Sequence, residues 1–104
     1  MPIALAITSC PDAESARRLC RAIVEQRLAV CVTQLPGARS VFRWEGGEQE
    51  AREIVCLIKK TTKRTGALRQ RLPLLHPYEL PELIALDVTD GLPAYLGWIV
   101  AGTT

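Results

Sequence analysis

The feature of the sequence that most constrains the fold is a pair of long apolar segments on either side of one short turn. Residues 30–34 and 38–44 predict strand on one side, residues 54–58 predict strand on the other, and Glu45-Gly46-Gly47-Glu48 is a turn signal between them. The arms of this hairpin run well beyond the about five or six residues of an ordinary strand. Because a proline cannot donate to a β-ladder, Pro36-Gly37 predicts a bulge, a kink or an edge in the first arm.

Before the hairpin, residues 3–7 form a short uncharged apolar run that predicts a central strand, buried on both faces. Ser9-Cys10-Pro11-Asp12 is a helix-start signal, with acidic residues placed to favour the helix dipole. The apolar residues that follow recur at helical spacing: Ala16, Leu19, Cys20, Ile23, Val24 and Leu28. This spacing predicts an amphipathic helix lying on a sheet.

After the hairpin, residues 62–75 predict a second helix that Pro73 must kink or tighten. Residues 76–82 predict an irregular loop fixed by two prolines, residues 83–88 a fourth strand, and Pro93 opens a short C-terminal helix. The order is therefore β-α-β-β-α-β-α.

With right-handed crossovers, this order predicts an α+β fold of the ferredoxin-like kind, a four-stranded antiparallel sheet with two helices on one face. We expect a single domain over residues 1–104. The expected core consists of Ile3, Leu5, Ile7, Leu19, Ile23, Val55, Leu57, Ile84 and Leu86.

Two helices cover only one face of such a sheet, and the long hairpin overhangs a body this small. Val41, Phe42 and Trp44 on the hairpin would be left in water in a monomer. Exposed apolar surface and open strand edges usually mark a partner. Since most soluble oligomers are symmetric assemblies of one chain, we expect the chain to assemble with copies of itself.

Composition narrows the classes of function. A net charge of +2 implies no strong attraction to nucleic acid or to a membrane surface. The N-terminus lacks the features of a secretory signal, and no apolar run approaches the roughly 20 residues of a membrane helix, so we expect a cytoplasmic protein. The four cysteines form no C-x-x-C pair, and Cys20, Cys31 and Cys56 are interpreted as small buried hydrophobic residues.

No catalytic centre is recognisable. His76 is the single histidine, the nucleotide-binding glycine motifs are missing, and no glycine-flanked serine suggests an activated nucleophile. The loop carboxylates, among them Glu79 and Glu82, are most simply solvated. We therefore expect no enzymatic activity and no organic cofactor.

Three features remain as candidates for binding. Residues 59–64 form a basic tract that leads into a helix, which favours a solvated face or else a site for a small anion. Cys10 lies beside a predicted helix N-terminus, which would lower its pKa. His76 is interpreted either as a structural hydrogen-bonding group near a helix end or as a metal ligand together with Cys10.

A series of motifs then resembles one family. In chain order, the motifs are Thr8-x-Cys10-Pro11-Asp12, Leu35-Pro36-Gly37-x-x-Ser40, Trp44-Glu45-Gly46, Ile58-Lys59, His76-Pro77-Tyr78-Glu79-x-Pro81-Glu82, Val88-Thr89-Asp90-Gly91 and Tyr95-Leu96-x-Trp98. The chain is similar over essentially its whole length to CutA, the divalent-cation-tolerance protein family.

The resemblance implies a tight homotrimer of ferredoxin-like subunits whose long hairpins cross between neighbours. It also implies a cytoplasmic protein of the metal response, linked to tolerance of copper and other divalent metals. Family members bind copper through a cysteine of the first strand and two adjacent histidines. By position, His76 matches the second histidine, while Leu75 and Thr8 occupy the places of the other two ligands. Cys10 is not the matching residue but lies two residues after Thr8, on the same face of a strand, so the residues proposed to bind a metal ion, possibly copper, are His76 and Cys10.

A second hypothesis is a ligand sensor or adaptor. Trimeric ferredoxin-like proteins also resemble the PII signalling proteins, which bind small anionic ligands in clefts between subunits. By that analogy Trp44, Lys59, Tyr78 and Glu79 would line a cleft. The expected partners are thus other copies of the chain, with a small anionic ligand as an alternative and neither nucleic acid nor membrane.

Overall fold

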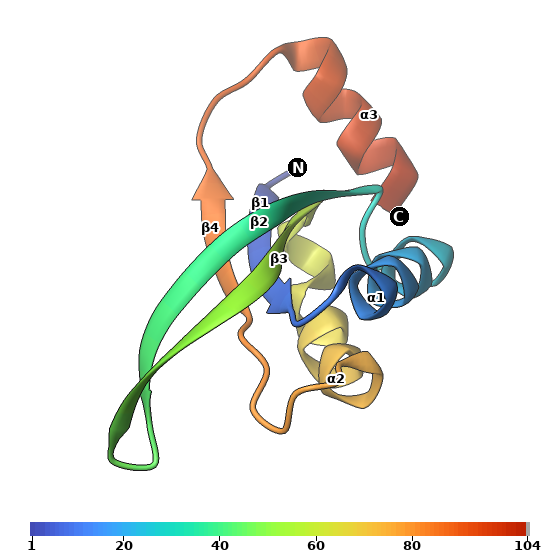
Figure 1. Ribbon diagram of the computed structural model, residues 1–104. Coiled ribbons are helices and arrows are strands. Elements are labelled where there is room, and N and C mark those ends of the chain that lie inside the picture. The colour runs from blue at the N-terminus through green and yellow to red at the C-terminus, as the bar shows by residue number, and fades with distance from the viewer. Residues whose placement is uncertain (104) are drawn as a thin grey trace.

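The computed structural model describes residues 1–103, so Thr104, the last residue of the expected 1–104 domain, lies outside the described residues. Figure 1 shows the arrangement of the elements. In chain order they are β1 (Ile3–Cys10), α1 (Ala13–Glu25), β2 (Cys31–Trp44), β3 (Gly47–Thr61), the 3₁₀ turn η1 (Thr62–Arg64), α2 (Thr65–Leu75), β4 (Ile84–Val88) and α3 (Pro93–Thr103).

The four strands form one antiparallel sheet in the order β2-β3-β1-β4. Helices α1 and α2 lie on the same face of this sheet, and α3 crosses near one end of it (Figure 1). The predicted α+β fold with an antiparallel sheet is confirmed, in the strand order of the ferredoxin-like arrangement.

The β2–β3 hairpin extends far beyond the rest of the molecule (Figure 1). Its strands contain 14 and 15 residues, and the chain measures 44 Å along its longest axis against 25 and 22 Å along the others. Glu45 and Gly46 make the turn with φ of 50° and 80°. Positive φ at both central residues is the backbone of a two-residue turn whose twist matches that of the strands.

A β-bulge in β2 decides which way the outer hairpin faces. Leu35 pairs with Val55 but Ala38 pairs with Glu53, so β2 has one extra residue at Pro36-Gly37, where Gly37 adopts a φ of 82°. Because strand side chains alternate between faces, one extra residue reverses the alternation beyond it. The even-numbered residues of the outer arm, including Phe42 and Trp44, therefore share a face with Glu53.

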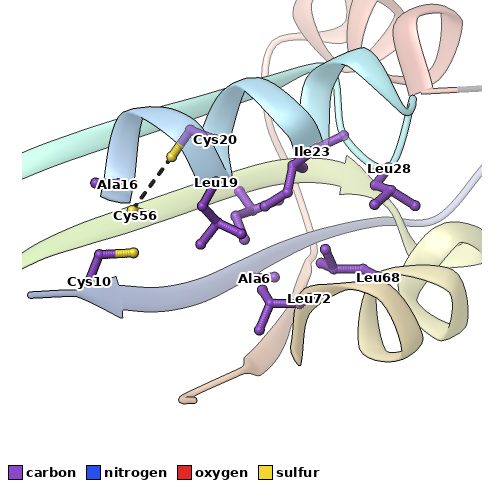
Figure 2. Packing of buried hydrophobic residues seen from close by; sticks show 12 residues of the cluster. Ala6, Cys10, Ala16, Leu19, Cys20, Ile23, Leu28, Cys56, Leu68 and Leu72 are labelled. Atoms are coloured by element: carbon purple, nitrogen blue, oxygen red, sulfur yellow. Dashed lines mark hydrogen bonds between the residues drawn. The ribbon is translucent and has the colours of Figure 1, made fainter. Parts of the chain in front are cut away.

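The buried core lies between the sheet and helices α1 and α2, as Figure 2 shows. On the sheet it uses mostly small side chains, and the helices supply the larger ones. Its main members are Ala6, Cys10, Cys56 and Ile58 from the strands and Ala16, Leu19, Cys20, Ile23, Leu68 and Leu72 from the helices.

The expected core was partly wrong, because its strand residues all lie on the sheet face that points away from α1 and α2. Leu19, Ile23 and Ile3 are buried. The remaining six are only half-buried or are exposed: Leu5, Ile7, Val55, Leu57, Ile84 and Leu86. These six lie on the sheet face opposite α1 and α2, which we call the open face. Bulky apolar residues alternate with small ones along β1, so apolarity alone did not tell which set faces the helices.

Helix α3 covers one end of the open face. A cavity between them is lined by Ile3, Leu5 and Lys59 of the sheet and by Tyr95 and Ile99 of the helix. Near its C-terminal end the helix approaches the start of β2 closely. A Cβ added at Gly102 would overlap Cγ2 of Val30 and lie 3.0 Å from its Cβ.

This close approach predicts that Gly102→Ala destabilises the protein by roughly 1–3 kcal/mol, because the stiff valine side chain has little freedom to yield. Gly97→Ala is the matched control, since an added Cβ at this position of the same helix meets nothing within 4 Å. The control should raise stability by up to about 1 kcal/mol through helix propensity. Urea unfolding of both variants measures the difference, and equal effects would contradict the close approach.

Candidate functional site

A cavity of about 680 Å³ lies between the hairpin and the loop that precedes β4. We call it the hairpin cavity. Phe42, Trp44 and Glu53 line it from the hairpin, Ser9 from the end of β1, and residues 78–82 from the loop. The bulge in β2 makes this cavity possible, because it places both hairpin aromatics on the face that carries Glu53.

The buried centre of the cavity is a small network around Glu53, which is only 8% exposed. The Tyr78 hydroxyl donates to Oε2 of Glu53 at 2.7 Å. Burial, followed by this hydrogen bond, raises the pKa of Tyr78. Tyr78 therefore remains a phenol that donates to the carboxylate.

Ser9 joins Glu53 to a second carboxylate. Its hydroxyl oxygen lies 3.3 Å from Oε2 of Glu53 and 3.2 Å from Oε1 of Glu82. A serine hydroxyl carries a single proton, so it donates to one of these carboxylates at a time. Two acidic side chains thus meet at one neutral donor.

His76 anchors the loop that carries Tyr78. It is the C-cap residue of α2, and its Nδ1 accepts a hydrogen bond from the backbone N–H of Tyr78 at 3.1 Å. The proton of the neutral ring must then sit on Nε2, which donates to the Ser9 carbonyl oxygen at 2.8 Å. Burial lowers the pKa of His76, which favours this neutral form. Both ring nitrogens therefore tie the loop to the end of β1.

Cys10 and His76, which the sequence could not show to meet, do lie side by side. Sγ of Cys10 is 3.9 Å from Nε2 of His76, and both residues are buried. Further along the same core, Sγ of Cys20 is 3.6 Å from Sγ of Cys56 (Figure 2). All four cysteines of the chain are free thiols, and Cys31 stands apart, half-buried on β2.

The expectation of a lowered pKa at Cys10 was wrong. Hydrogen bonding with Cys56, and then burial, raise the pKa of the Cys10 thiol. Cys10 is the last residue of β1 and faces the core, whereas the helix begins later, with Asp12 as the N-cap accepting from the Ser15 N–H at 2.7 Å. The dipole of α1 therefore acts on Asp12, whose pKa is lowered mainly by its hydrogen bond to the Ser15 backbone.

The first two lysines of the basic tract make hydrogen bonds within the fold and do not form a solvated surface. Nζ of Lys59 donates to Oγ1 of Thr33 at 3.0 Å, and Lys59 lines the cavity under α3. Lys60 is fully buried, donates to the Thr61 carbonyl oxygen at 2.7 Å, and has its pKa lowered to about 8 by burial. Ile54, Cys56 and Ile58 point to the same face as Lys60, but the whole run 54–58 is apolar, so only the register of β3 shows that Lys60 faces the core.

Of the four residues expected to line a ligand cleft, Trp44, Tyr78 and Glu79 do line the hairpin cavity. Lys59 lies at the other cavity and not at this one. Sequence reasoning missed Glu53 and Ser9, which form the buried centre. The only available signal for Glu53 was its position directly before the apolar run 54–58, and its neighbour Arg52 is charged as well.

Among residues 1–103, no group of three or more His, Cys, Asp or Glu side chains is arranged to hold a metal ion. Within the same residues, none of the helices has both the length and the apolarity needed to cross a membrane.

Comparison with known proteins identifies the family. The family model described as CutA1 divalent ion tolerance protein matches residues 4–102. A divalent-cation tolerance protein CutA of Thermus thermophilus is 40% identical over 97 residues, which cover 93% of this chain and 94% of that protein. The protein of that name in Pectobacterium atrosepticum is 44% identical over 95 residues, 91% of this chain and 86% of the other.

Solved structures agree with the sequence relatives. CutA of Xylella fastidiosa superimposes with a TM-score of 0.94 at 47% identity, covering 98% of both chains. A protein of Archaeoglobus fulgidus described as a periplasmic divalent cation tolerance protein CutA gives a TM-score of 0.94 at 27% identity, covering 98% of this chain and 99% of that one. With the family model, the relatives and the fold in agreement, this chain belongs to the CutA family of divalent-cation-tolerance proteins.

Proposed function

We propose that this protein acts in divalent-cation tolerance as a cytoplasmic homotrimer that catalyses no reaction. The observation that carries the proposal is the open face of the sheet. Leu35, Ile84 and Leu86 are bulky apolar residues on this face, and they are 46%, 51% and 52% exposed. Apolar surface of this kind on one contiguous face is typical of a protein–protein interface.

Copies of the same chain are the partner that fits this face best. The strands at both edges of the sheet, β2 and β4, have unpaired edges, and the hairpin projects beyond the rest of the molecule (Figure 1). A closed symmetric assembly covers the same patch on every subunit. Three copies are what the resemblance to the CutA family implies, with hairpins crossing between neighbours.

The arrangement around Ser9 supports a role without catalysis. Nε2 of His76 is hydrogen-bonded to the Ser9 carbonyl oxygen, while the Ser9 hydroxyl points to the carboxylates of Glu53 and Glu82. A nucleophilic serine needs a base hydrogen-bonded to its hydroxyl. The only histidine therefore holds backbone in place and does not activate the neighbouring hydroxyl.

If the open face is the interface, Leu86→Glu should shift the protein toward smaller species, because burying an unpaired carboxylate opposes assembly. Leu74→Glu is the matched control, since Leu74 is 75% exposed on α2, which covers the other face of the sheet. Sedimentation velocity of both variants at several concentrations makes the comparison. Loss of assembly in both, or in neither, would contradict this interface.

For the metal, we propose that each subunit binds copper weakly through Cys10 and His76. Metal bonds to thiolate sulfur and imidazole nitrogen are about 2.3 Å and about 2.0–2.1 Å long in zinc sites. The 3.9 Å between Sγ and Nε2 is slightly less than their sum, so an ion of similar bond lengths fits between the two atoms. A thiolate ligand favours reduced copper.

Two costs keep this binding weak. The Cys10 thiol must lose a proton although its pKa is raised, and Nε2 must give up its hydrogen bond to the Ser9 carbonyl oxygen. Since the ion competes with a proton on the thiol, copper affinity should rise as the pH is raised.

Equilibrium dialysis against reduced copper under anaerobic conditions tests the site. Cys10→Ser and His76→Ala should each lower the affinity at least about tenfold, whereas Cys31→Ser should leave it unchanged because Cys31 lies outside the cluster. Circular dichroism shows whether each variant is folded, and the pH dependence of the unmodified protein gives a second readout. Affinity that is independent of pH and of both substitutions would remove these residues from any copper site.

A second candidate function is the binding of a small molecule in the hairpin cavity. Its volume of about 680 Å³ falls within the range of about 300–1,000 Å³ typical of ligand sites. Aromatic walls around a few polar groups are the usual composition of such sites. A protein of this kind would sense or carry a small ligand through the cavity, independently of the copper contact.

A further inference from the structure

We propose that Cys20 of α1 and Cys56 of β3 form a redox-sensitive pair, which a hydroperoxide as small as hydrogen peroxide converts into a disulfide. This inference goes beyond the proposed function and needs neither the trimer nor bound copper. It also changes the interpretation of both cysteines, which the sequence had presented only as small buried hydrophobic residues.

The first argument is the distance between the two sulfur atoms. Sγ of Cys20 lies 3.6 Å from Sγ of Cys56, and the dashed line in Figure 2 joins them. At this separation the sulfurs are in van der Waals contact, so no other atom lies between them. Formation of a disulfide bond of about 2.0 Å requires the sulfurs to approach by roughly 1.6 Å, which involves one χ1 angle on each residue and the packing of α1 on β3.

The second argument is the place of the pair within one subunit. Both side chains belong to the core between the sheet and α1, and they are 5% and 0% exposed. This is the helix-covered face of the sheet, opposite the open face that we propose as the interface. The contact between the two thiols is therefore built by a single chain and does not depend on which surfaces a second copy covers.

The third argument is that Cys10, the other thiol near Cys56, is not a suitable partner for a disulfide. Cys56 pairs with Thr8 across the two strands, and Cys10 pairs with Ile54, so Cys10 and Cys56 are diagonal neighbours on one face. Diagonal residues of neighbouring strands lie about 7–8 Å apart, whereas the Cα atoms of a disulfide are usually about 4.4–6.8 Å apart. The geometry therefore selects Cys20 as the partner of Cys56.

Burial also decides which oxidant fits and which thiol reacts first. A small, neutral hydroperoxide needs far less space than a bulky disulfide such as oxidised glutathione. Cys20 keeps some contact with solvent, whereas Cys56 keeps none. Hydrogen bonding with Cys56 lowers the pKa of Cys20, and the thiolate is the nucleophilic form. Cys20 is therefore the attacking residue.

The reaction balances with one molecule of hydrogen peroxide. The Cys20 thiolate attacks one peroxide oxygen, the O–O bond breaks, and the hydroxide that leaves takes up the thiol proton as water. The sulfur of Cys56 then attacks the sulfenic acid on Cys20, so the S–S bond forms while the S–O bond breaks, and a second water leaves. The two thiols lose two electrons in total, and the peroxide accepts them.

Thiol counting tests whether the pair reacts. The unmodified, folded protein is treated with one equivalent of hydrogen peroxide in the presence of a chelator, so that metal ions take no part. Its free thiols are then measured with Ellman's reagent in denaturant. We expect the four thiols of each chain to fall to two, and dithiothreitol to restore all four.

Peptide mapping without reduction locates the bond. Cleavage after lysine and arginine puts each cysteine in a different peptide, namely residues 1–17, 19–21, 28–39 and 53–59. The peroxide-treated protein should yield peptide 19–21 linked to peptide 53–59. This map needs no substitution, so it decides the matter even if a variant of the buried pair fails to fold.

Variants test the two roles. In Cys56→Ala, the sulfenic acid on Cys20 should persist and be trapped by dimedone, whereas Cys20→Ala should slow the loss of core thiols at least about tenfold. Cys31→Ala is the matched control and should still form the linked peptide, because Cys31 lies outside the core cluster. Circular dichroism shows whether each variant is folded.

Two results would overturn the inference. One is the survival of all four thiols in a millimolar excess of peroxide, which would mean that the pair is inert packing. The other is a peptide map in which the oxidised protein links any other two peptides, or modifies Cys31 alone. Neither result bears on the assembly of the chain or on copper binding, so the proposed function stands or falls separately.

Discussion

The structure depends on a sheet that is apolar on both faces and has helices over only one. On the helix side, small residues such as Ala6, Cys10 and Cys56 allow α1 and α2 to approach closely. The bulkier residues of the same strands point to the open face, where Ile84 and Leu86 remain about half exposed. Removing such side chains from water is worth about 1.5–3 kcal/mol each when complete. Burial of these side chains therefore favours association of the chain with other copies, and the long hairpin is available for contacts between them.

The functional features gather where the apolar open face gives way to acidic residues at the base of the hairpin. There, His76 ties the end of α2 to the end of β1, Tyr78 follows it on the loop, and its hydroxyl holds Glu53. The last two residues of β1 point into two different environments. Ser9 faces the carboxylates of the hairpin cavity, and Cys10, the next residue, faces the thiols of the core. The proposed copper contact and the hairpin cavity therefore lie on opposite sides of one strand and share His76 as a support.

Local sequence patterns predicted the fold well. They were weakest for strand lengths and for the packed face of the sheet, which depend on how the strands pair. Periodicity and turn signals predicted the order of elements and the turn at Glu45 and Gly46, and of the bulge, kink or edge expected at Pro36-Gly37 the structure shows the bulge. Strand lengths were underestimated, since β3 runs from Gly47 and not from Ile54. Polar residues of the outer hairpin remain in strand because each arm satisfies the other's backbone groups. The face of the sheet that packs on the helices could not be chosen from apolarity alone.

The site was harder to predict than the fold, because its contacts join distant parts of the chain. Trp44, Tyr78 and Glu79 were expected at a cleft from resemblance to known proteins, and they line the hairpin cavity. Glu53 was missed because its role requires Ser9, 44 residues away, and Tyr78, 25 residues away. Lys59 lines the cavity under α3 within one chain, and only the register of β3 shows that it faces this helix.

The central claim is that copies of the same chain cover the open face, and the mass of the unmodified protein in dilute solution tests it most directly. Sedimentation equilibrium at submicromolar concentration should give three times the 11.5 kDa of one chain, together with the circular dichroism of a folded protein. A folded species of 11.5 kDa under those conditions would contradict the account.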